Sequence, residues 1–437
     1  MAANLDEKAA LAQADDAVKS LFQFRDHYFE THGLENARQK ASDLDKTLKE
    51  TLTKLDKLQF CIDNKASYFS LRGKALNVVA EYDSQAVDFL SKAVKLDPSL
   101  TEAWNNLGEC YWKNKDIDAA RNCFMCALAK KRDKVTLRNL SMVLRQIGKD
   151  STEILENVKE SVKIAKEAVG QDFSDGRSWF VLGNAYLSLF FAGGQSPSSL
   201  KQSMAAYTKA EKDTIERNNP DLHFNRAMAY RYQEEYALAL GGFERAALLD
   251  PQWEDPRDEK RKLESYLRNT LEYIEGKGKL KAKKLQNLVR SLKPSDAGPY
   301  SGSEYTSPAG KTTSITQVMI KNLEREVNTG KVIVGKVAAV IPFENPVPFP
   351  FVLVDADMEC IGVTVFNLVA GKGFNVGDSI AIPEPYVQET EIKLESGEML
   401  NFKSIRVDNP VVMAVNKRKI GADKLAFSVL SVTNKSD

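Results

Sequence analysis

An arginine and a methionine stand three residues apart in the stretch NLSMVLRQIG, residues 139–148, as Arg145 and Met142. Side chains three residues apart share one face of an α-helix. Leu140 and Leu144, one turn apart, would form another face, suited to a hydrophobic core. A guanidinium binds a carboxylate in a bidentate manner, and a thioether offers an adaptable apolar wall. The stretch therefore predicts a helix with one packing face and one ligand-binding face.

Other residues that often carry catalysis or bind metals occur in unsuitable patterns. Cys123 and Cys126 form a C-x-x-C inside a helix-forming run, and without a second pair this favours helix packing over a zinc site. The glycine- and lysine-rich stretch at residues 370–378 lacks the spacing of a phosphate-binding Walker loop. The histidines lack a nucleophile or metal-ligand partner at a suitable spacing: His27, His32 and His223. We therefore expect a binding protein with no enzymatic activity, no cofactor and no metal.

The composition agrees with an intracellular multidomain protein. The 437 residues are enough for two or three domains, and the net charge of +1 gives no overall attraction to nucleic acids or membranes. Five scattered cysteines fit a reducing compartment. Neither a signal peptide nor an apolar run of about 20 residues is present, so we expect no membrane contact and a cytoplasmic or nuclear location.

A repeat positions residues 139–148. The segment 103–130 has the W-x2-L-G-x2-Y…A-x3-F-x2-A spacing of a tetratricopeptide repeat. Related spacing recurs around residues 71–98, 179–210 and 223–251, with longer turns in two of these units. In the degenerate unit at 137–168, Leu and Ser replace the usual Trp, Gly and Tyr. The residues carrying the 103–130 match are Trp104, Leu107, Gly108, Tyr111, Ala120, Phe124 and Ala127. The five units predict a helical solenoid.

The chain changes period after the repeats. Ser, Gly and Pro dominate residues 294–314, as in a linker. Five short strands with turn signals follow, at residues 329–343, 349–357, 360–368, 377–385 and 402–416. They predict a small OB-fold (oligonucleotide/oligosaccharide-binding) barrel, with a small β-sandwich as the alternative. The predicted segments are an N-terminal helical hairpin or cap (1–66), the repeats (67–256), capping helices with a basic segment (257–293), the linker (294–314) and the OB fold (315–437).

Nucleic-acid binding by the barrel is left open by its composition. Residues 301–437 contain 14 Lys and Arg against 16 Asp and Glu, so a positive groove is not evident. Lys417-Arg418-Lys419 is a short basic cluster that a solvated loop also explains. Aromatic side chains that could stack on bases, or equally form the core, are Phe343, Phe349, Phe351 and Phe366.

Positions 2, 5, 6, 9 and 12 of each first helix, with the signature Trp at position 4, are expected to line the concave groove of the solenoid. Repeated asparagines there can hold the backbone of an extended peptide. Opposite charges there suit a ligand with adjacent opposite charges, although an internal network of ion pairs is an alternative. The candidate residues are Asn106, Asn139, Asn184, Asn225, Met142, Met228, Arg145, Arg231, Asp221 and, on the capping helix, Asp255.

A lysine-rich run follows the repeats, EGKGKLKAKKLQNLVRSLK, at residues 275–293. Lysine arrays attract phosphate-rich surfaces such as ribosomal RNA independently of sequence. A solvated helix end is the alternative.

The order of these segments resembles the tetratricopeptide repeat protein 5 family over essentially the whole chain. The resemblance rests on strings such as FRDHYFETH, KVTLRNLSMVLRQ, DGRSWFVLGNAYLSL, NPDLHFNRA, KAKKLQ and GDSIAIPEP. It implies a repeat superhelix followed by an OB fold. It also implies that the groove recognises the N-terminal Met-Arg-Glu sequence of nascent tubulins on the ribosome, and that an mRNA-decay effector then degrades the tubulin mRNA.

The same resemblance implies roles for single residues. Arg145 would pair with the peptide's Glu, and Asp221 and Asp255 with its Arg; the family pattern has Glu at the latter position. Lys281 and Lys283, together with the adjacent Lys284, would bind the ribosome. A second implied role is that of a stress-responsive nuclear transcription cofactor, which scaffolds an acetyltransferase coactivator and an actin-regulating partner and contacts chromatin through the OB fold.

Overall fold

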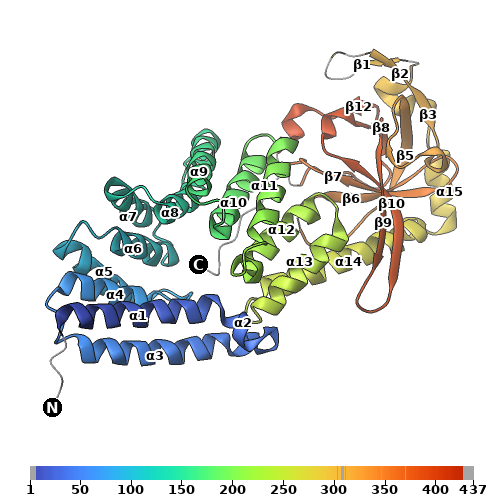
Figure 1. Ribbon diagram of the computed structural model, residues 1–437. Helices are drawn as coiled ribbons and strands as arrows, with labels where there is room; N and C mark the ends of the chain where they lie inside the picture. The colour runs from blue at the N-terminus through green and yellow to red at the C-terminus, as the bar shows by residue number, and fades with distance from the viewer. Residues whose placement is uncertain are drawn as a thin grey trace. The chain divides into compact units, whose positions relative to one another are not determined.

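The computed structural model describes residues 6–302, 304–306, 310, 312–345, 347–369 and 371–426. It divides into a helical unit, which includes residues 1–233 and 241–257, and a β-rich unit, which includes residues 234–240 and 258–426. Figure 1 shows the helices in blue through green to yellow and the strands in yellow-orange to red. Within the described residues, no helix is long and apolar enough to cross a membrane.

The helical unit begins with a hairpin of α1 (Glu7–Asp26) and α3 (Lys40–Leu58), which are joined by the short α2 (Tyr28–His32). On α1, the buried residues Ala10, Ala14, Val18 and Leu21 recur every three or four positions and pack against α3 and α4. The hairpin thereby covers the first repeat with an apolar face, as a cap would.

Five helical pairs follow, as the repeat spacing predicts (Figure 1). Close approach within a pair depends on small residues: a Cβ on Gly108 would lie 2.5 Å from the Phe124 ring, and one on Gly183 would lie 2.7 Å from the Tyr207 ring. The pairs are α4 (Lys65–Leu76) with α5 (Ser84–Leu96), α6 (Thr101–Lys113) with α7 (Ile117–Lys130), α8 (Lys134–Leu144) with α9 (Ser151–Gln171), α10 (Gly176–Ala192) with α11 (Pro197–Ala210), and α12 (Pro220–Tyr232) with α13 (Tyr236–Leu249).

The β-rich unit contains most of α14 (Asp255–Glu275), then α15 (Ala282–Arg290) and a barrel. The barrel strands are β5 (Lys331–Val340), β6 (Phe349–Val354), β7 (Cys360–Val365), β8 (Ser379–Pro383), β9 (Tyr386–Lys393) and β10 (Met399–Val407). They pair in the order β8-β5-β6-β7-β10-β9, with β7 and β10 parallel. Only Glu384 and Pro385 separate β8 from β9, so the chain passes directly from one end of this strand order to the other. This is the predicted OB-type barrel.

Two features of this unit differ from the sequence prediction. The strand β9 was not predicted, although it pairs with β10 along its whole length. The predicted linker at 294–314 is also structured. Its residues form a short helix (Pro294–Tyr300) and a hairpin of β1 (Glu304–Thr306) and β2 (Thr312–Ser314). Tyr300 and Tyr305 are buried in a cluster with Val332 and Val334 of β5, so the segment packs against the barrel because of its aromatic residues.

Four short strands complete the β structure. They are β3 (Thr316–Val318), which pairs with β5; β4 (Glu326–Val327), which pairs with β9; and β11 (Ala414–Val415) and β12 (Arg418–Lys419), which pair with each other.

Candidate functional site

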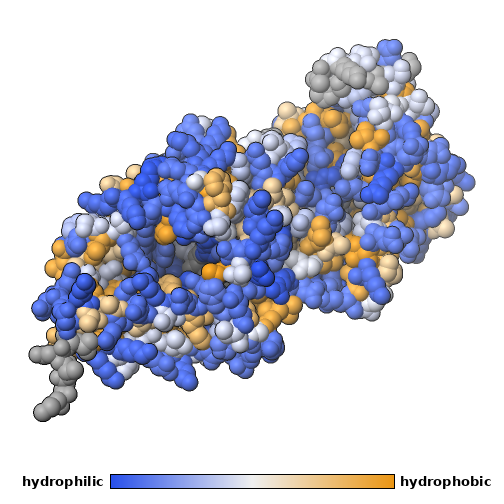
Figure 2. All heavy atoms as spheres, in the orientation of Figure 1, coloured by the Kyte–Doolittle hydropathy of each residue, from blue (hydrophilic) through white to orange (hydrophobic). Residues whose placement is uncertain are grey.

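The predicted ligand-facing residues lie on the first helices α4, α6, α8, α10 and α12, and we call this set of helices the first-helix row. Consecutive helices of the row contact one another, so side chains on neighbouring first helices lie side by side. Hydrophilic residues cover most of the helical unit on the face seen in Figure 2.

Arg145 directly follows α8, and its side chain is half-buried. Its Nε donates to the Ser141 carbonyl at 3.4 Å, whereas its Nη1 is buried without a hydrogen-bond partner. Burial lowers the pKa of Arg145 to about 10, opposed only by Tyr207, and no carboxylate within the described ranges forms an ion pair with it. A buried charge without a partner costs free energy, so this guanidinium is prepared to accept an anion.

Met142 is buried one turn before Arg145, and Met228 is half-buried on α12. Both lie in the first-helix row at the same repeat position. They can supply adaptable apolar contacts beside the charged groups.

The four predicted asparagines differ in their bonding. Asn106 Nδ2 donates to the Glu102 carbonyl of its own helix at 2.8 Å. Asn139 Nδ2 donates to Glu109 Oε1 at 2.9 Å. Asn184 Oδ1 accepts from Tyr207 Oη at 2.6 Å and from Asn225 Nδ2 at 3.2 Å, and both asparagines are buried.

The predicted acidic residues lie further along the row. Asp221 is buried in the first turn of α12, where its N–H donates to Asn219 Oδ1 at 3.0 Å. Asp255 is exposed at the start of α14, and Trp253 Nε1 donates to its Oδ2 at 3.0 Å. Arg231 is half-buried in the last turn of α12. The row thus has a cation at the end of α8 and carboxylates at the starts of α12 and α14.

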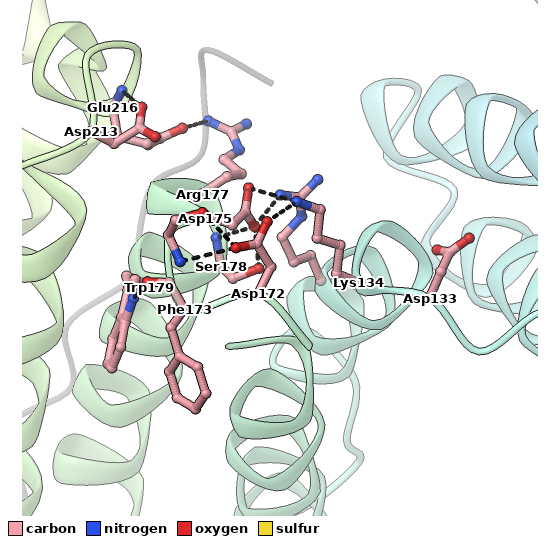
Figure 3. A network of polar contacts seen from close by, with 12 residues as sticks. Asp133, Lys134, Asp172, Phe173, Asp175, Arg177, Ser178, Trp179, Asp213 and Glu216 are labelled. Carbon is pink, nitrogen blue, oxygen red and sulfur yellow. Dashed lines mark hydrogen bonds and ion pairs between the residues drawn. The ribbon is translucent and has the colours of Figure 1, made fainter. Parts of the chain in front are cut away.

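Ion pairs between repeats, which the sequence did not reveal, lie at the starts of the first helices (Figure 3). Arg138 pairs with Asp175 at 2.7 Å, and Lys134 pairs with Asp172 at 2.7 Å. Burial opposes ionisation of Asp175, but the charges of Arg138 and Lys134 and the bonds from Ser178 outweigh it, so its pKa is lowered. These four residues therefore form an internal ion-pair network, an arrangement that the sequence analysis considered only for the predicted groove charges.

A second polar group, on α4 and α6, also escaped prediction. Glu109 accepts from Asn77 Nδ2 at 3.1 Å as well as from Asn139, and Lys113 Nζ donates to Asn77 Oδ1 at 2.8 Å. Burial lowers the pKa of Lys113, partly opposed by Glu109. The register rule could have found these residues, since Glu109 occupies position 9 and Asn77 position 12.

The predicted ribosome-binding lysines lie at the start of α15. Lys281, Lys283 and Lys284 are exposed, and none of them forms an ion pair within the described ranges. Their neighbours differ: Lys279 pairs with Glu272 at 2.9 Å, and Lys277 donates to the Met358 carbonyl at 3.0 Å. Three ammonium groups thus remain available for an external anionic surface.

The barrel does not offer its phenylalanines for base stacking as a set. Phe351 and Phe366 are 0% and 1% exposed, so for these two the alternative, a core position, is correct. Phe349 is half-buried, and Phe343 packs on Tyr266 with ring centroids 4.6 Å apart.

The basic cluster of the barrel is partly engaged. Lys417 lies 3.9 Å from Asp296, and the Lys419 ammonium lies over the Tyr300 and Tyr305 rings. The cysteines Cys123 and Cys126 are free, and no metal-binding cluster occurs among the described residues.

Comparison with known proteins gives a consistent result along the whole chain. Residues 314–429 match the family model of the tetratricopeptide repeat protein 5 OB fold domain, and residues 101–129 match a tetratricopeptide repeat. Tetratricopeptide repeat protein 5 of Homo sapiens is 44% identical over 426 residues, covering 97% of each chain. The Mus musculus protein is 44% identical over 428 residues, covering 98% of this chain and 97% of its own.

Proposed function

Because the chain belongs to the tetratricopeptide repeat protein 5 family, we propose that it is a non-enzymatic adaptor for tubulin autoregulation. In this role it binds the N-terminal Met-Arg-Glu peptide of nascent tubulin on the ribosome and recruits an effector that degrades the tubulin mRNA. The observation that carries the proposal is Arg145, whose buried Nη1 has no hydrogen-bond partner among the residues that the structure describes.

An incoming carboxylate would change the energetics of Arg145 more than those of any paired arginine. The fold already buries Nη1 of this guanidinium in the free protein. A ligand Glu would therefore add a charge-assisted and geometrically specific bond with little further loss of hydration at that atom. This supports Arg145 as the residue that recognises the third residue of the peptide.

The remaining groove residues fit the rest of such a peptide. Asp221 and Asp255 carry charge complementary to a ligand Arg, and Met142 and Met228 suit its apolar side chains. Asn139, which can exchange its bond to Glu109 for one to the ligand, and Arg231 would bond its backbone and carboxylates, since an amide both donates and accepts. A peptide with adjacent basic and acidic residues would match the carboxylates Asp221 and Asp255 with its basic side chain and Arg145 with its acidic one.

The exposed Lys281, Lys283 and Lys284 support the ribosomal part of the proposal. Ammonium groups attract RNA phosphates through release of counterions, and such attraction needs no sequence match. This role places the protein in the cytoplasm. The nuclear scaffold role would rely more on the barrel, where burial of Phe351 and Phe366 leaves fewer rings for stacking.

Calorimetric titration with a Met-Arg-Glu-Ile peptide tests the groove. We expect Arg145→Ala to weaken binding about 30-fold or more, because one partner of a desolvated charge pair is removed. A Met-Arg-Gln-Ile peptide should bind weakly to the wild type and lose little more with Arg145→Ala. Arg121→Ala, at an exposed site, serves as the control. Equal affinity of wild type and Arg145→Ala, or no binding by either, would contradict the proposal.

Co-sedimentation with ribosomes tests the docking surface. Reversing the charges of Lys281, Lys283 and Lys284 to Glu should abolish association at low salt. The matched control reverses Lys277 and Lys279, which already have partners within the protein. Unchanged association of the first variant would remove these lysines from the proposal.

A further inference from the structure

The basic residues Lys417, Arg418 and Lys419 form an exposed cluster at the β11–β12 hairpin, which we call the hairpin cluster. The register of β11 and β12 leaves only Asn416 and Lys417 between them, as a two-residue turn. Both turn residues have a positive φ, 48° and 74°, as a type I′ hairpin turn requires. Glycine is favoured at the second position of such a turn, and lysine rarely adopts this conformation. The fold thus places a cation where the local geometry favours a residue without a side chain.

The backbone of this turn is bonded to the rest of the β-rich unit. Ser379 N–H donates to Asn416 Oδ1 at 3.0 Å, and Asn416 Nδ2 donates to Asp378 Oδ1 at 2.8 Å. A Cβ on Gly298 would lie 2.6 Å from the carbonyl oxygen of Lys417, so the chain at Gly298 packs directly against the turn. The cluster is therefore presented from a fixed backbone, which limits the backbone entropy lost on binding.

The carboxylates that contact the hairpin are fewer than its cations. Asp296 is buried, and its Oδ1 lies 3.9 Å from Lys417 Nζ while its Oδ2 lies 3.5 Å from Lys336 Nζ. Arg418 forms no ion pair with a carboxylate in the described ranges. Asp296 and Asp378 thus stand against Lys336 and the three cations of the hairpin cluster. The hairpin therefore keeps a local excess of positive charge, although the barrel as a whole is nearly balanced.

The hairpin cluster adjoins the basic segment at residues 276–303, whose sequence contains Asp296 as its only acidic residue. Asp296 Oδ2 accepts the N–H of Lys293 at 3.0 Å, so the same carboxylate contacts this segment and the hairpin. α15 packs on β5, and the short helix Pro294–Tyr300 packs on both β5 and β12. The predicted ribosome-binding lysines and the hairpin cluster are therefore linked through one set of contacts. The exposed cations of the segment include Lys281, Lys283, Lys284, Arg290 and Lys293.

We propose that the hairpin cluster is a second phosphate-binding surface for ribosomal RNA, which acts together with the lysines of α15. The inference rests on the proposed docking to the ribosome. Phosphates repeat at short intervals along a polynucleotide, so cations on neighbouring elements can each neutralise one and release its counterion. Arg418 adds a planar guanidinium, which binds phosphate oxygens in a bidentate manner. The barrel thereby contributes to docking through a charged hairpin and not through stacking by the buried Phe351 and Phe366.

Co-sedimentation of the full chain with ribosomes over a series of salt concentrations tests the inference. We expect Lys417→Gln combined with Arg418→Gln to weaken association about 30-fold at about 0.1 M salt. The slope of log affinity against log salt should fall by about 2, since two phosphate contacts are lost. The control, Lys321→Gln combined with Lys403→Gln, removes the same charge from barrel lysines that form ion pairs within the protein at 2.7 and 2.8 Å. It should leave the slope nearly unchanged.

Lys417→Gly separates the charge from the backbone conformation. Glycine adopts the positive φ of this position without a steric cost, so the variant should unfold at the temperature of the wild type or above it. We expect it to weaken ribosome association about fivefold and to lower the salt slope by about 1. Its affinity for the Met-Arg-Glu-Ile peptide should equal that of the wild type, because the groove is unaltered.

The outcomes distinguish this inference from the proposed docking. A salt slope unchanged in both hairpin variants would overturn the inference, and the docking proposal would stand if charge reversal of the α15 lysines still abolished association. Unchanged association after both sets of substitutions would overturn both. A parallel titration with duplex DNA separates the two sources of phosphate. If the hairpin variants weakened binding to DNA and not to ribosomes, the assignment to ribosomal RNA would be wrong.

Discussion

Arg138 lies on α8 and Arg145, seven residues later, lies at its end, yet their side chains have different partners. Arg138 pairs with Asp175 of the next repeat at 2.7 Å. Within the described part of the chain, the buried Nη1 of Arg145 has no hydrogen-bond partner. Both are two-turn neighbours in one helix, so residue type and helix register do not distinguish them. The comparison teaches that a buried charged group without a partner in the fold indicates a candidate ligand site.

The largest expected effect comes from removing the partner of the paired arginine. Asp175→Ala should reduce the free energy of unfolding by about 3 kcal/mol, since it removes the N-cap of α10 and leaves Arg138 without its carboxylate. Urea unfolding followed by helical circular dichroism measures this. Asp172→Ala, which removes a more exposed partner of Lys134, is the matched control and should cost less. Equal losses would show that burial does not distinguish these pairs.

The next expected effects have opposite signs at the two arginines. Arg138→Met should lower the free energy of unfolding by about 2 kcal/mol, because the cation that Asp175 keeps among the described residues is Lys134, at the longer distance of 3.6 Å. Arg145→Met should raise it by about 1 kcal/mol, because an unpaired buried charge is replaced by an apolar side chain of similar length. The same urea experiment compares them. If Arg145→Met destabilises the protein as much as Arg138→Met, the fold already provides a partner for Arg145.

Most of the fold could be predicted from the sequence because its signals are local. The residues Trp104, Gly108 and Phe124 recur at fixed spacing, and Gly108 indeed allows the close contact with Phe124. The strand β9 was missed because its sequence, YVQETEIK, contains Gln, Thr and three charged residues and therefore looks too polar for a strand. Its pairing with β10 is not visible in the local sequence. The hairpin of β1 and β2 was missed because a Ser- and Gly-rich composition hides the few residues, such as Tyr305, that anchor it.

The candidate site could be predicted only in part. Repeat register places Arg145 on the ligand-facing side, and the family resemblance assigns it a role. Neither indicates that Arg138 pairs with Asp175, 37 residues further along the chain, while Arg145 pairs with none of the described carboxylates. Such pairing depends on how the loops between repeats fold, and a repeat signature does not contain that information.

The pH dependence of stability tests the charge of Asp175 separately from its cap. Asp175→Asn keeps the N-cap, so the remaining difference from wild type reports the ionised carboxyl. The folded pKa of Asp175 is lowered, and its contribution is therefore present above the unfolded value of about 3.9 and lost as pH falls through the folded pKa. Unfolding measurements from pH 7 down to pH 2 should show the gap between the variants closing only below about pH 4. A constant gap would mean that the charge contributes nothing.

The smallest expected effect extends the comparison from charged to neutral groups. Asn106 already donates its Nδ2 to the Glu102 carbonyl at 2.8 Å, whereas Asn139 donates to the side chain of Glu109 and can exchange that bond for one to a peptide. Asn106→Ala should therefore change Met-Arg-Glu-Ile affinity by about twofold or less, and Asn139→Ala by about threefold to fivefold. Calorimetry on both variants beside Arg145→Ala would rank the three. If Asn106→Ala lowered the peptide affinity as much as Asn139→Ala, a side chain bonded within the fold could still take part in recognition. The difference between paired and unpaired side chains, seen for Arg138 and Arg145, would then hold for charged groups alone.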